Sequence, residues 1–231
     1  MTDELRLASD RSHGPVTGIL QRPAEARALF VLAHGAGADL RHPFLQAMAD
    51  ELERVGVATL RFNFPYTEKG RRAPDPQPLC EAYVRSVCAD AARLAPGLPL
   101  FAGGKSFGGR MTSNAAASEP LAGVRGLVFL GFPLHPPKRP GRSRAEHLCR
   151  VTAPLLFLQG TRDDLAELGL IREVCAELGP RASLREIDGA DHSFAVRKSS
   201  GRTSADVRKE LADLIGVWVG PLISVATPEP L

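Results

Sequence analysis

Short apolar runs alternate with longer stretches of helical periodicity along most of this chain of 231 residues. Apolar runs of roughly five or six residues are typical of strands that are buried on both faces of a parallel sheet. Such runs predict seven strands, at Gly18–Leu20, Ala28–Ala33, Val57–Phe62, Leu98–Ala102, Gly126–Leu130, Leu155–Gln159 and Ser183–Ile187.

Apolar positions that recur every three to four residues predict helices between these strands. The predicted helices are Phe44–Val55, Leu79–Leu94, Phe107–Ser118, Leu165–Leu178 and Ser204–Val217. Strands that alternate with such helices pair in parallel, and the helices cover both faces of the sheet. The pattern therefore predicts an α/β fold with a doubly wound, mostly parallel sheet. We expect one domain over residues 1–231, whose ends, 1–14 and 224–231, are candidates for fraying.

The candidate nucleophile is the serine of Gly104-Lys105-Ser106-Phe107-Gly108, a G-x-S-x-G pentapeptide. It lies between the predicted strand Leu98–Ala102 and the predicted helix that begins at Phe107. A serine at a sharp strand-to-helix turn exposes its hydroxyl, and the helix that follows directs free N–H groups at it. We therefore expect Ser106 to act as a nucleophile. The alternative is a glycine-rich turn in which the serine only caps the helix.

A serine hydroxyl needs a general base, which near pH 7 is usually a histidine. Of the six histidines, His192 has the expected position, in a loop after the predicted strand Ser183–Ile187. His34 belongs to a different motif, described below. Two others are expected to be exposed on helical patterns and two to lie in polar or proline-rich segments, namely His42 and His147, and His13 and His135.

The imidazole must be oriented by a carboxylate. The predicted strand Leu155–Gln159 ends in a glycine turn that is followed by Asp163 and Asp164, at the sheet edge where Ser106 is also expected. We predict that Asp163 is the orienting acid and that Asp164 caps a helix beginning near residue 165. Asp191 is a weaker candidate because it precedes the histidine directly, and adjacent side chains tend to diverge.

Acyl transfer also needs two N–H donors aimed at the oxyanion. One is expected from Phe107, directly after the nucleophile. The other is expected from the small-residue loop His34-Gly35-Ala36-Gly37-Ala38, which follows a predicted strand. Small side chains let the backbone approach a substrate closely. We assign the second donor to Ala36, with Gly35 and Gly37 as open alternatives.

Together these motifs resemble the α/β-hydrolase superfamily, and more narrowly its small hydrolases without a lid, of the dienelactone-hydrolase type. The matching segments are His34–Gly37, Gly104–Gly108, Gly160–Asp163 and Gly189–His192. The resemblance implies a Ser–His–Asp triad, with the family's chain order of serine, aspartate and histidine, and acyl hydrolysis without a cofactor or metal. Dienelactone hydrolases use a cysteine nucleophile, whereas this chain has Ser106, so their substrate is not carried over.

Composition narrows the classes of function. A hydrophobic content of 44% and a charged content of 24% are ordinary for a globular protein, and a net charge of +3 does not argue for nucleic acid. No apolar run approaches the roughly 20 residues of a membrane helix, and no signal peptide is visible, so we expect no membrane association. Four scattered cysteines lack metal-binding spacing and favour the cytoplasm, namely Cys80, Cys88, Cys149 and Cys175.

Two proline-rich loops, 64–78 and 132–144, follow predicted strands and are expected to surround the active site. The two loops contain seven basic residues, which we call the basic rim. A basic rim favours an anionic acyl substrate or an acidic partner; the alternative is that these residues only keep the surface solvated. Only a short helix near 144–149 fits into the second loop, so we expect no lid. Lys105 is expected at the surface or behind the nucleophile. The basic residues of the rim are Lys69, Arg71, Arg72, Lys138, Arg139, Arg142 and Arg144.

Two other classes of function remain open. The segment Gly103–Ser106 resembles the end of a phosphate-binding P-loop, but Pro99 occupies the place of the first glycine. The other class is a non-catalytic scaffold with the hydrolase fold that binds a partner through the basic rim. We favour a serine hydrolase that cleaves a small carboxylic ester or a related acyl substrate.

Overall fold

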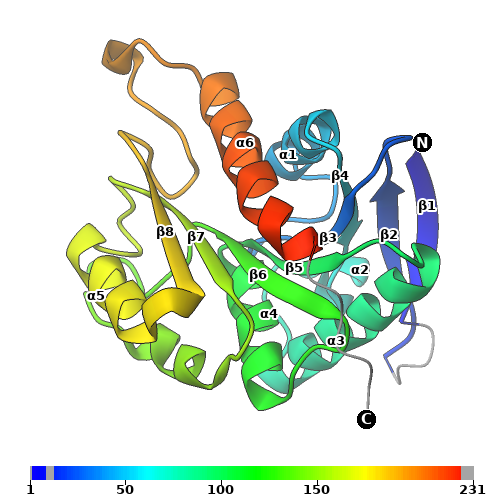
Figure 1. Cartoon of the computed structure of the whole chain (residues 1–231). Helices are drawn as coiled ribbons and strands as arrows, with labels where there is room; N and C mark the ends of the chain where they lie inside the picture. Colours follow the sequence, from blue (N-terminus) through cyan, green and yellow to red (C-terminus); the bar gives the residue numbers. More distant parts are fainter. Residues whose placement is uncertain (1, 9–12, 225–231) are drawn as a thin grey trace.

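The computed structural model describes residues 2–8 and 13–224, and an eight-stranded sheet forms its centre (Figure 1). The strand order is β1-β2-β4-β3-β5-β6-β7-β8. Strands β3 to β8 pair in parallel, whereas β1 and β2 are antiparallel at one edge. The strands are β1 Thr2–Leu7, β2 Val16–Gln21, β3 Ala28–Ala33, β4 Val57–Phe62, β5 Leu100–Lys105, β6 Val124–Leu130, β7 Leu155–Gly160 and β8 Ala182–Ile187.

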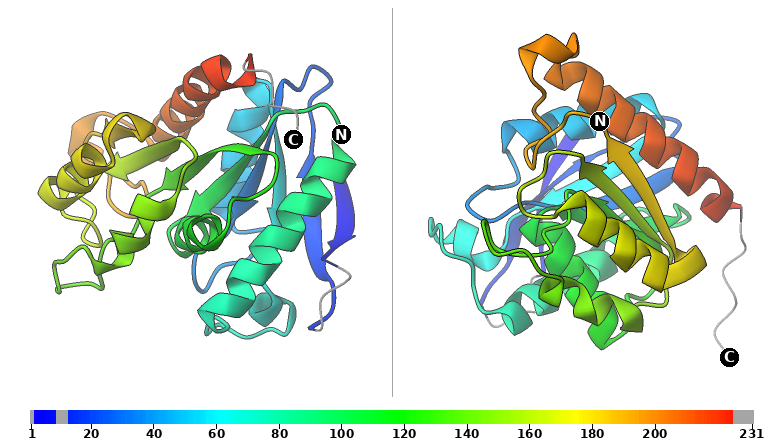
Figure 2. Two further views of the ribbon diagram at one scale, coloured as in Figure 1. Left: turned by 60° about the horizontal axis from the view of Figure 1, so that its bottom comes forward. Right: turned by 90° about the vertical axis from the view of Figure 1, so that its left-hand side faces the viewer.

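Helices cover both faces of this sheet (Figure 2). Helices α1 and α6 pack on one face, and α3, α4 and α5 pack on the other. The helices are α1 Pro43–Arg54, α2 Pro65–Glu68, α3 Gln77–Leu94, α4 Phe107–Ser118, α5 Leu168–Leu178 and α6 Ser204–Ile223. Three short 3₁₀ segments are η1 Ser143–Arg150, η2 Gly179–Arg181 and η3 Lys198–Ser200. The doubly wound, mostly parallel fold predicted from the sequence is confirmed.

The central strands are apolar at nearly every position because each of them feeds two cores. In β3, Leu29 and Val31 pack toward α3 and α4, while Phe30 and Leu32 pack toward α1 and α6. Successive side chains of a strand point to opposite faces of the sheet, so a strand between two helical layers has no polar side. This arrangement explains the continuous apolar runs that predict the strands.

The N-terminal segment differs from the prediction. Residues 2–7 form strand β1, which pairs with β2 antiparallel from Thr2 opposite Gln21 to Leu7 opposite Val16. The expectation that this part of segment 1–14 frays is therefore wrong. The strand lies exposed at the sheet edge, so its charged side chains need no apolar run, and backbone pairing holds it. The expected fraying at residues 9–12 and 225–231 lies outside the described residues.

The winding direction of the sheet changes next to β3. From β3 the chain passes to β4 on one side, and from β4 it returns to β5 on the other side of β3. The carboxyl ends of β3 and β5 therefore lie side by side at a topological switch point, where open α/β sheets bind ligands. The loop 34–38 leaves β3 at this point, and Ser106 leaves β5 at the same edge.

Candidate active site

Ser106 occupies a sharp turn between β5 and α4. Its backbone angles are φ 50° and ψ −113°, a conformation that is strained for a residue with a side chain. The turn is possible because β5 approaches β3 closely: a Cβ atom on Gly104 would lie 2.2 Å from the carbonyl oxygen of Ala33. The packing of these two strands therefore holds the strained turn that carries the Ser106 hydroxyl.

His192 reaches this serine from the loop after β8. Its Nε2 atom lies 2.9 Å from Ser106 Oγ, and its Nδ1 atom lies 2.7 Å from Asp163 Oδ2. Asp191, the rival carboxylate, instead accepts backbone N–H groups of its own loop, from Ser193 at 2.8 Å and Ala195 at 2.9 Å. The structure thus brings Ser106, His192 and Asp163 into one hydrogen-bonded chain, while Asp191 shapes the loop that carries the imidazole.

The carboxylate of Asp163 is buried and fully bonded. Besides His192, its Oδ2 atom accepts from Gln159 Nε2 at 2.6 Å, and its Oδ1 atom accepts from the N–H of Leu165 at 2.8 Å. Gln159 in turn accepts from the N–H of Phe132 at 2.9 Å, which fixes the orientation of its amide. Gln159 was not predicted from the sequence; its only signal is a polar side chain near the end of an apolar strand.

The prediction that Asp164 caps a helix beginning near residue 165 is wrong. Asp164 is exposed, and α5 begins four residues after it, at Leu168, with Glu167 as its N-cap residue. The reason is the bond from the Leu165 N–H to Asp163, which ties these residues into a turn before the helix begins. Of the two adjacent aspartates, only Asp163 therefore contacts His192.

The two predicted oxyanion donors lie beside the serine. Phe107 is the first residue of α4, so its N–H has no partner within the helix. Ala36 and Phe107 line the same cavity as Ser106, whereas the alternatives Gly35 and Gly37 are not among the residues that line it. The geometry therefore favours Ala36 over its glycine neighbours for the second donor.

The buried His34 imidazole holds the loop that carries Ala36. Its Nε2 atom accepts from the N–H of Phe64 at 3.2 Å, so Nδ1 carries the proton and donates to the carbonyl oxygen of Gly35 at 2.8 Å. Because a trans peptide is planar, fixing the Gly35 carbonyl also fixes the Ala36 N–H on the opposite side. Burial lowers the pKa of His34 to about 4, which keeps this imidazole neutral near pH 7.

Lys105 lies behind the nucleophile and is not a surface residue. Its ammonium donates to the carbonyl oxygen of His192 at 2.6 Å. Glycine at position 131 leaves room for this contact, because a Cβ atom there would lie 3.1 Å from Lys105 Nζ and 3.5 Å from both Asp163 Oδ2 and His192 Nδ1. Burial lowers the pKa of Lys105 to about 8, against the opposite effect of the charges of Asp163 and Asp191.

A cavity of about 430 Å³ opens beside Ser106. Two arginines line it, Arg110 on α4 and Arg144 on η1. Arg110 was not predicted, although the sequence carries a signal for it: it follows Ser106 by four residues, which places both on one side of a helix. The lining residues are Ala36, Pro74, Asp75, Gln77, Ser106, Phe107, Arg110, Met111, Pro133, Arg144 and Leu165.

Most of the predicted basic rim does not line this cavity. Of its seven members, Arg144 alone is among the lining residues in the described part of the chain. Arg142 points away and bonds Glu177 on α5, and Arg71 forms an ion pair with Asp75. Among the described residues, the positive charge that lines this cavity therefore comes from two arginines, Arg144, which was predicted, and Arg110, which was not.

The expectation that His147 is an exposed helical residue is wrong. It is buried, its Nε2 atom lies 2.7 Å from Ser113 Oγ, and burial together with Arg150 and Arg110 lowers its pKa to about 4. No carboxylate pairs with it in the described residues. His42, in contrast, is exposed as expected and accepts the first N–H bond of α1.

Clusters of three or more residues that could hold a metal are absent from residues 2–8 and 13–224. Within the same ranges, every helix is too short or too polar to span a bilayer.

Comparison with known proteins places the chain among hydrolases. The family model described as "Alpha/beta hydrolase domain" matches residues 26–220. A serine hydrolase without a lid from Xanthomonas campestris superposes with a TM-score of 0.73 at 20% identity, over 98% of this chain and 97% of that chain. A dienelactone hydrolase from Anabaena variabilis also superposes with a TM-score of 0.73 at 20% identity, over 95% of this chain and 96% of that one.

Two curated sequences from Mycobacterium tuberculosis, both named as candidate phosphoribosyl transferases, are 29% identical to this chain over 184 residues. The match covers 78% of this chain but only 40% of the relatives. The chain thus spans about two fifths of the length of these relatives.

Proposed function

Because this chain belongs to the family of α/β-hydrolase domains, we propose that it is a serine hydrolase that cleaves a small carboxylic ester or a related acyl substrate. The observation that carries the proposal is the hydrogen-bonded chain from Ser106 through His192 to Asp163, with distances of 2.9 Å and 2.7 Å. This order of hydroxyl, imidazole and buried carboxylate is the arrangement that activates a serine for acyl transfer.

The first step is the attack of Ser106 on the substrate carbonyl. The Nδ1–H of His192 donates to Asp163, so Nε2 is free to take the proton of the attacking hydroxyl. Asp163 then stabilises the imidazolium, and it is held for this task by Gln159 and the N–H of Leu165. His192 returns the proton to the leaving group, and the same base activates the water that clears the acyl-enzyme.

The negative charge that develops on the carbonyl oxygen is stabilised by the N–H groups of Phe107 and Ala36. Donors of this kind act strongly because they are oriented before the reaction begins. His34 supports that orientation through the Gly35 carbonyl, and its neutral state near pH 7 preserves the bond. No step in this scheme calls for a cofactor or a metal.

The open cavity supports small or easily presented acyl groups, and in the described structure the segment between β6 and β7 contains only the short η1, which is too small for a cap domain. Dienelactone hydrolases and esterases occur among the structural neighbours, but their identity to this chain is low and supports the fold alone. Phosphoribosyl transfer is not part of the proposal, because the match to the mycobacterial relatives covers only 40% of their length.

We also propose a cytoplasmic location. All four cysteines are free, and three of them are buried, which fits a reducing compartment. Burial raises the pKa of each buried thiol to about 12, so these side chains act as packing residues. They are Cys80, Cys88 and Cys175.

A serine-reactive fluorophosphonate probe tests the proposed function. We expect it to label the wild-type protein and to label Ser106→Ala no more than background, with parallel loss of p-nitrophenyl butyrate hydrolysis. Ser113→Ala is the matched control, because Ser113 also contacts a histidine but is buried and lacks a paired carboxylate. Labelling of this variant is expected to persist.

A folded wild-type protein that neither reacts with the probe nor hydrolyses a panel of p-nitrophenyl esters of varied chain length would refute the proposal. That result would favour a non-catalytic scaffold. Thermal unfolding of each variant shows whether a loss of labelling reflects chemistry or misfolding.

A further inference from the structure

We propose that Arg110 and Arg144 form a subsite for a carboxylate, so that the preferred substrate is an ester that carries a second, negatively charged group. The inference rests on the proposed hydrolase function and names its substrate class. Both arginines line the cavity that also contains Ser106, and they belong to different elements, α4 and η1.

Neither arginine has an acidic partner in the described part of the chain, although both side chains are half-buried. Arg144 donates to the carbonyl oxygen of His135 at 3.0 Å, and the Arg110 guanidinium lies over the Phe107 ring at 5.9 Å. These contacts orient the two groups but leave both charges without a counter-ion.

The two charges also act on each other. Burial and the charge of Arg144 both lower the pKa of the Arg110 guanidinium, which remains protonated at physiological pH. Two desolvated cations held near each other are unfavourable unless an anion joins them. A carboxylate, which matches the planar fork of a guanidinium, would relieve this cost.

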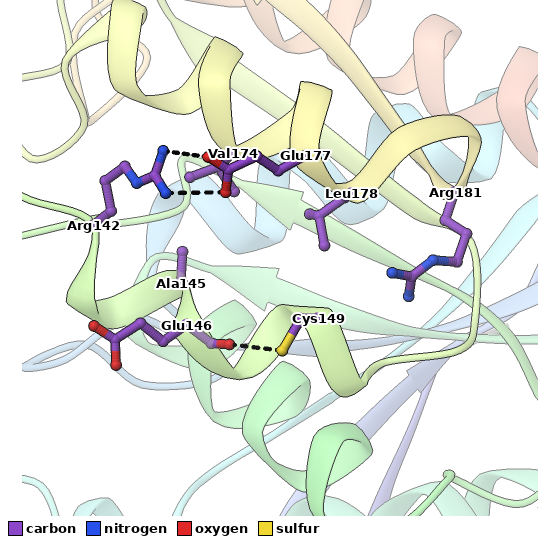
Figure 3. Close-up of a pocket in the computed structure, with 8 residues that line it drawn as sticks. All are labelled: Arg142, Ala145, Glu146, Cys149, Val174, Glu177, Leu178 and Arg181. Atoms are coloured by element: carbon purple, nitrogen blue, oxygen red, sulfur yellow. Dashed lines mark hydrogen bonds and ion pairs between the residues drawn. The ribbon is translucent and has the colours of Figure 1, made fainter.

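Many other arginines of this protein do have an acidic partner. Those with an acidic partner within 4.0 Å include Arg6, Arg41, Arg54, Arg71, Arg85, Arg93, Arg142, Arg172 and Arg202. Arg142 is the most informative of these because it lies two residues before Arg144. Figure 3 shows Arg142 directed at Glu177, in a different pocket between η1 and α5.

The carboxylate of Asp75 is the acidic group that lines the same cavity. Its Oδ1 atom is paired with Arg71, which balances its charge, and its buried Oδ2 atom has no hydrogen-bond partner. Asp75 therefore does not remove the excess positive charge at Arg110 and Arg144.

The position of Arg110 sets the spacing within the substrate. Its backbone N–H donates to the carbonyl oxygen of Ser106 at 3.1 Å, one helical turn along α4. Four residues of an α-helix span about 6 Å, so the guanidinium can meet a charged group a few carbon atoms from the carbonyl that Ser106 attacks. A half-ester of a short dicarboxylic acid has this spacing.

The test compares two esters of the same chain length, mono-p-nitrophenyl adipate, which carries a free carboxylate, and its methyl ester, which is neutral. We expect the wild-type kcat/KM to favour the charged ester by about tenfold or more, and this preference to shrink as salt screens the charges. Arg110→Met and Arg144→Met are each expected to lower the charged-to-neutral ratio about tenfold. A general loss of activity cancels in this ratio.

Arg142→Met is the matched control, since it removes the same charge from the same loop outside the cavity. Its charged-to-neutral ratio is expected to equal that of the wild type. A ratio near one in the wild type, or an equal loss in Arg142→Met and Arg144→Met, would overturn the carboxylate subsite while leaving the hydrolase proposal intact.

A binding measurement separates this subsite from the proposed chemistry. Monomethyl adipate is expected to bind Ser106→Ala more tightly than dimethyl adipate in calorimetry, and the additional change Arg144→Met is expected to remove the difference. Selective binding of the charged ligand in a protein that fails the fluorophosphonate test would retain the subsite and refute only the hydrolase. Equal binding of both ligands would refute the subsite.

Discussion

Two pockets next to η1 each contain an arginine, but only one of these arginines is paired with an acidic residue. In the pocket between η1 and α5, Arg142 bonds both oxygens of Glu177, and the thiol of Cys149 donates to a backbone carbonyl oxygen (Figure 3). In the cavity at Ser106, Arg144 has no acidic partner, and the nucleophilic atom contacts a histidine. Arginines only two residues apart thus have different environments.

This difference indicates how a candidate active site can be distinguished from a pocket whose residues have only a structural role. In the pocket between η1 and α5, the charge of Arg142 is balanced by the two oxygens of Glu177. At the Ser106 cavity, strained backbone, unpaired positive charge and free N–H groups remain, and each has a cost that a substrate or transition state would offset. Unsatisfied but ordered groups, more than cavity size, therefore identify the candidate active site.

The largest expected effect lies at the carboxylate behind His192. We expect Asp163→Asn to lower kcat by about 10⁴-fold, because an amide N–H in place of the Oδ2 atom would favour the wrong imidazole tautomer. The measurement is the hydrolysis of p-nitrophenyl butyrate, with thermal unfolding as a check on folding. Asp164→Asn, an exposed change one residue away, is the control and is expected to retain activity; the reverse result would assign the orienting role to Asp164.

A smaller effect is expected from the buried ammonium of Lys105. Its positive charge disfavours a second positive charge beside it, so Lys105→Met should make the active site easier to protonate. We expect the acid limb of the kcat/KM profile to move up by roughly half a unit to one unit. Because the pKa of Lys105 is about 8, the wild type carries this charge below that pH and loses it above, so the two profiles are expected to differ at acid pH and to converge above pH 8.

Lys69→Met, which removes an exposed lysine, is the control for this profile. A lower plateau with an unmoved acid limb in Lys105→Met would contradict the electrostatic role and leave Lys105 as a support for the His192 carbonyl.

The smallest effect is expected in the pocket between η1 and α5. The double change Arg142→Met and Cys149→Ala is expected to leave ester hydrolysis unchanged and to lower Tm by no more than about 2 °C, because exposed ion pairs are weak. Calorimetry and the p-nitrophenyl assay measure both outcomes. A marked loss of hydrolysis would show that this pocket is coupled to Ser106. The distinction between a structural pocket and the Ser106 cavity would then be wrong.

The sequence by itself determined the alternation of strands and helices, because apolar periodicity is local and follows from burial on one or two faces. It also placed Ser106, His192 and Asp163 at one sheet edge, since parallel strands end together. The structure then showed these side chains within hydrogen-bonding distance. Strand β1 was missed because an exposed edge strand needs no apolar run.

Only the tertiary structure decided which polar residues are partners. Gln159 supports Asp163, His34 orients the Gly35 carbonyl, and Lys105 bonds the His192 carbonyl, in each case through groups brought together by the fold. The fold also decides the partners of Arg144 and Arg142, two residues of the same type that lie close together in the sequence. Their environments differ because α5 supplies an acid to Arg142, and no local pattern encodes the position of a distant helix.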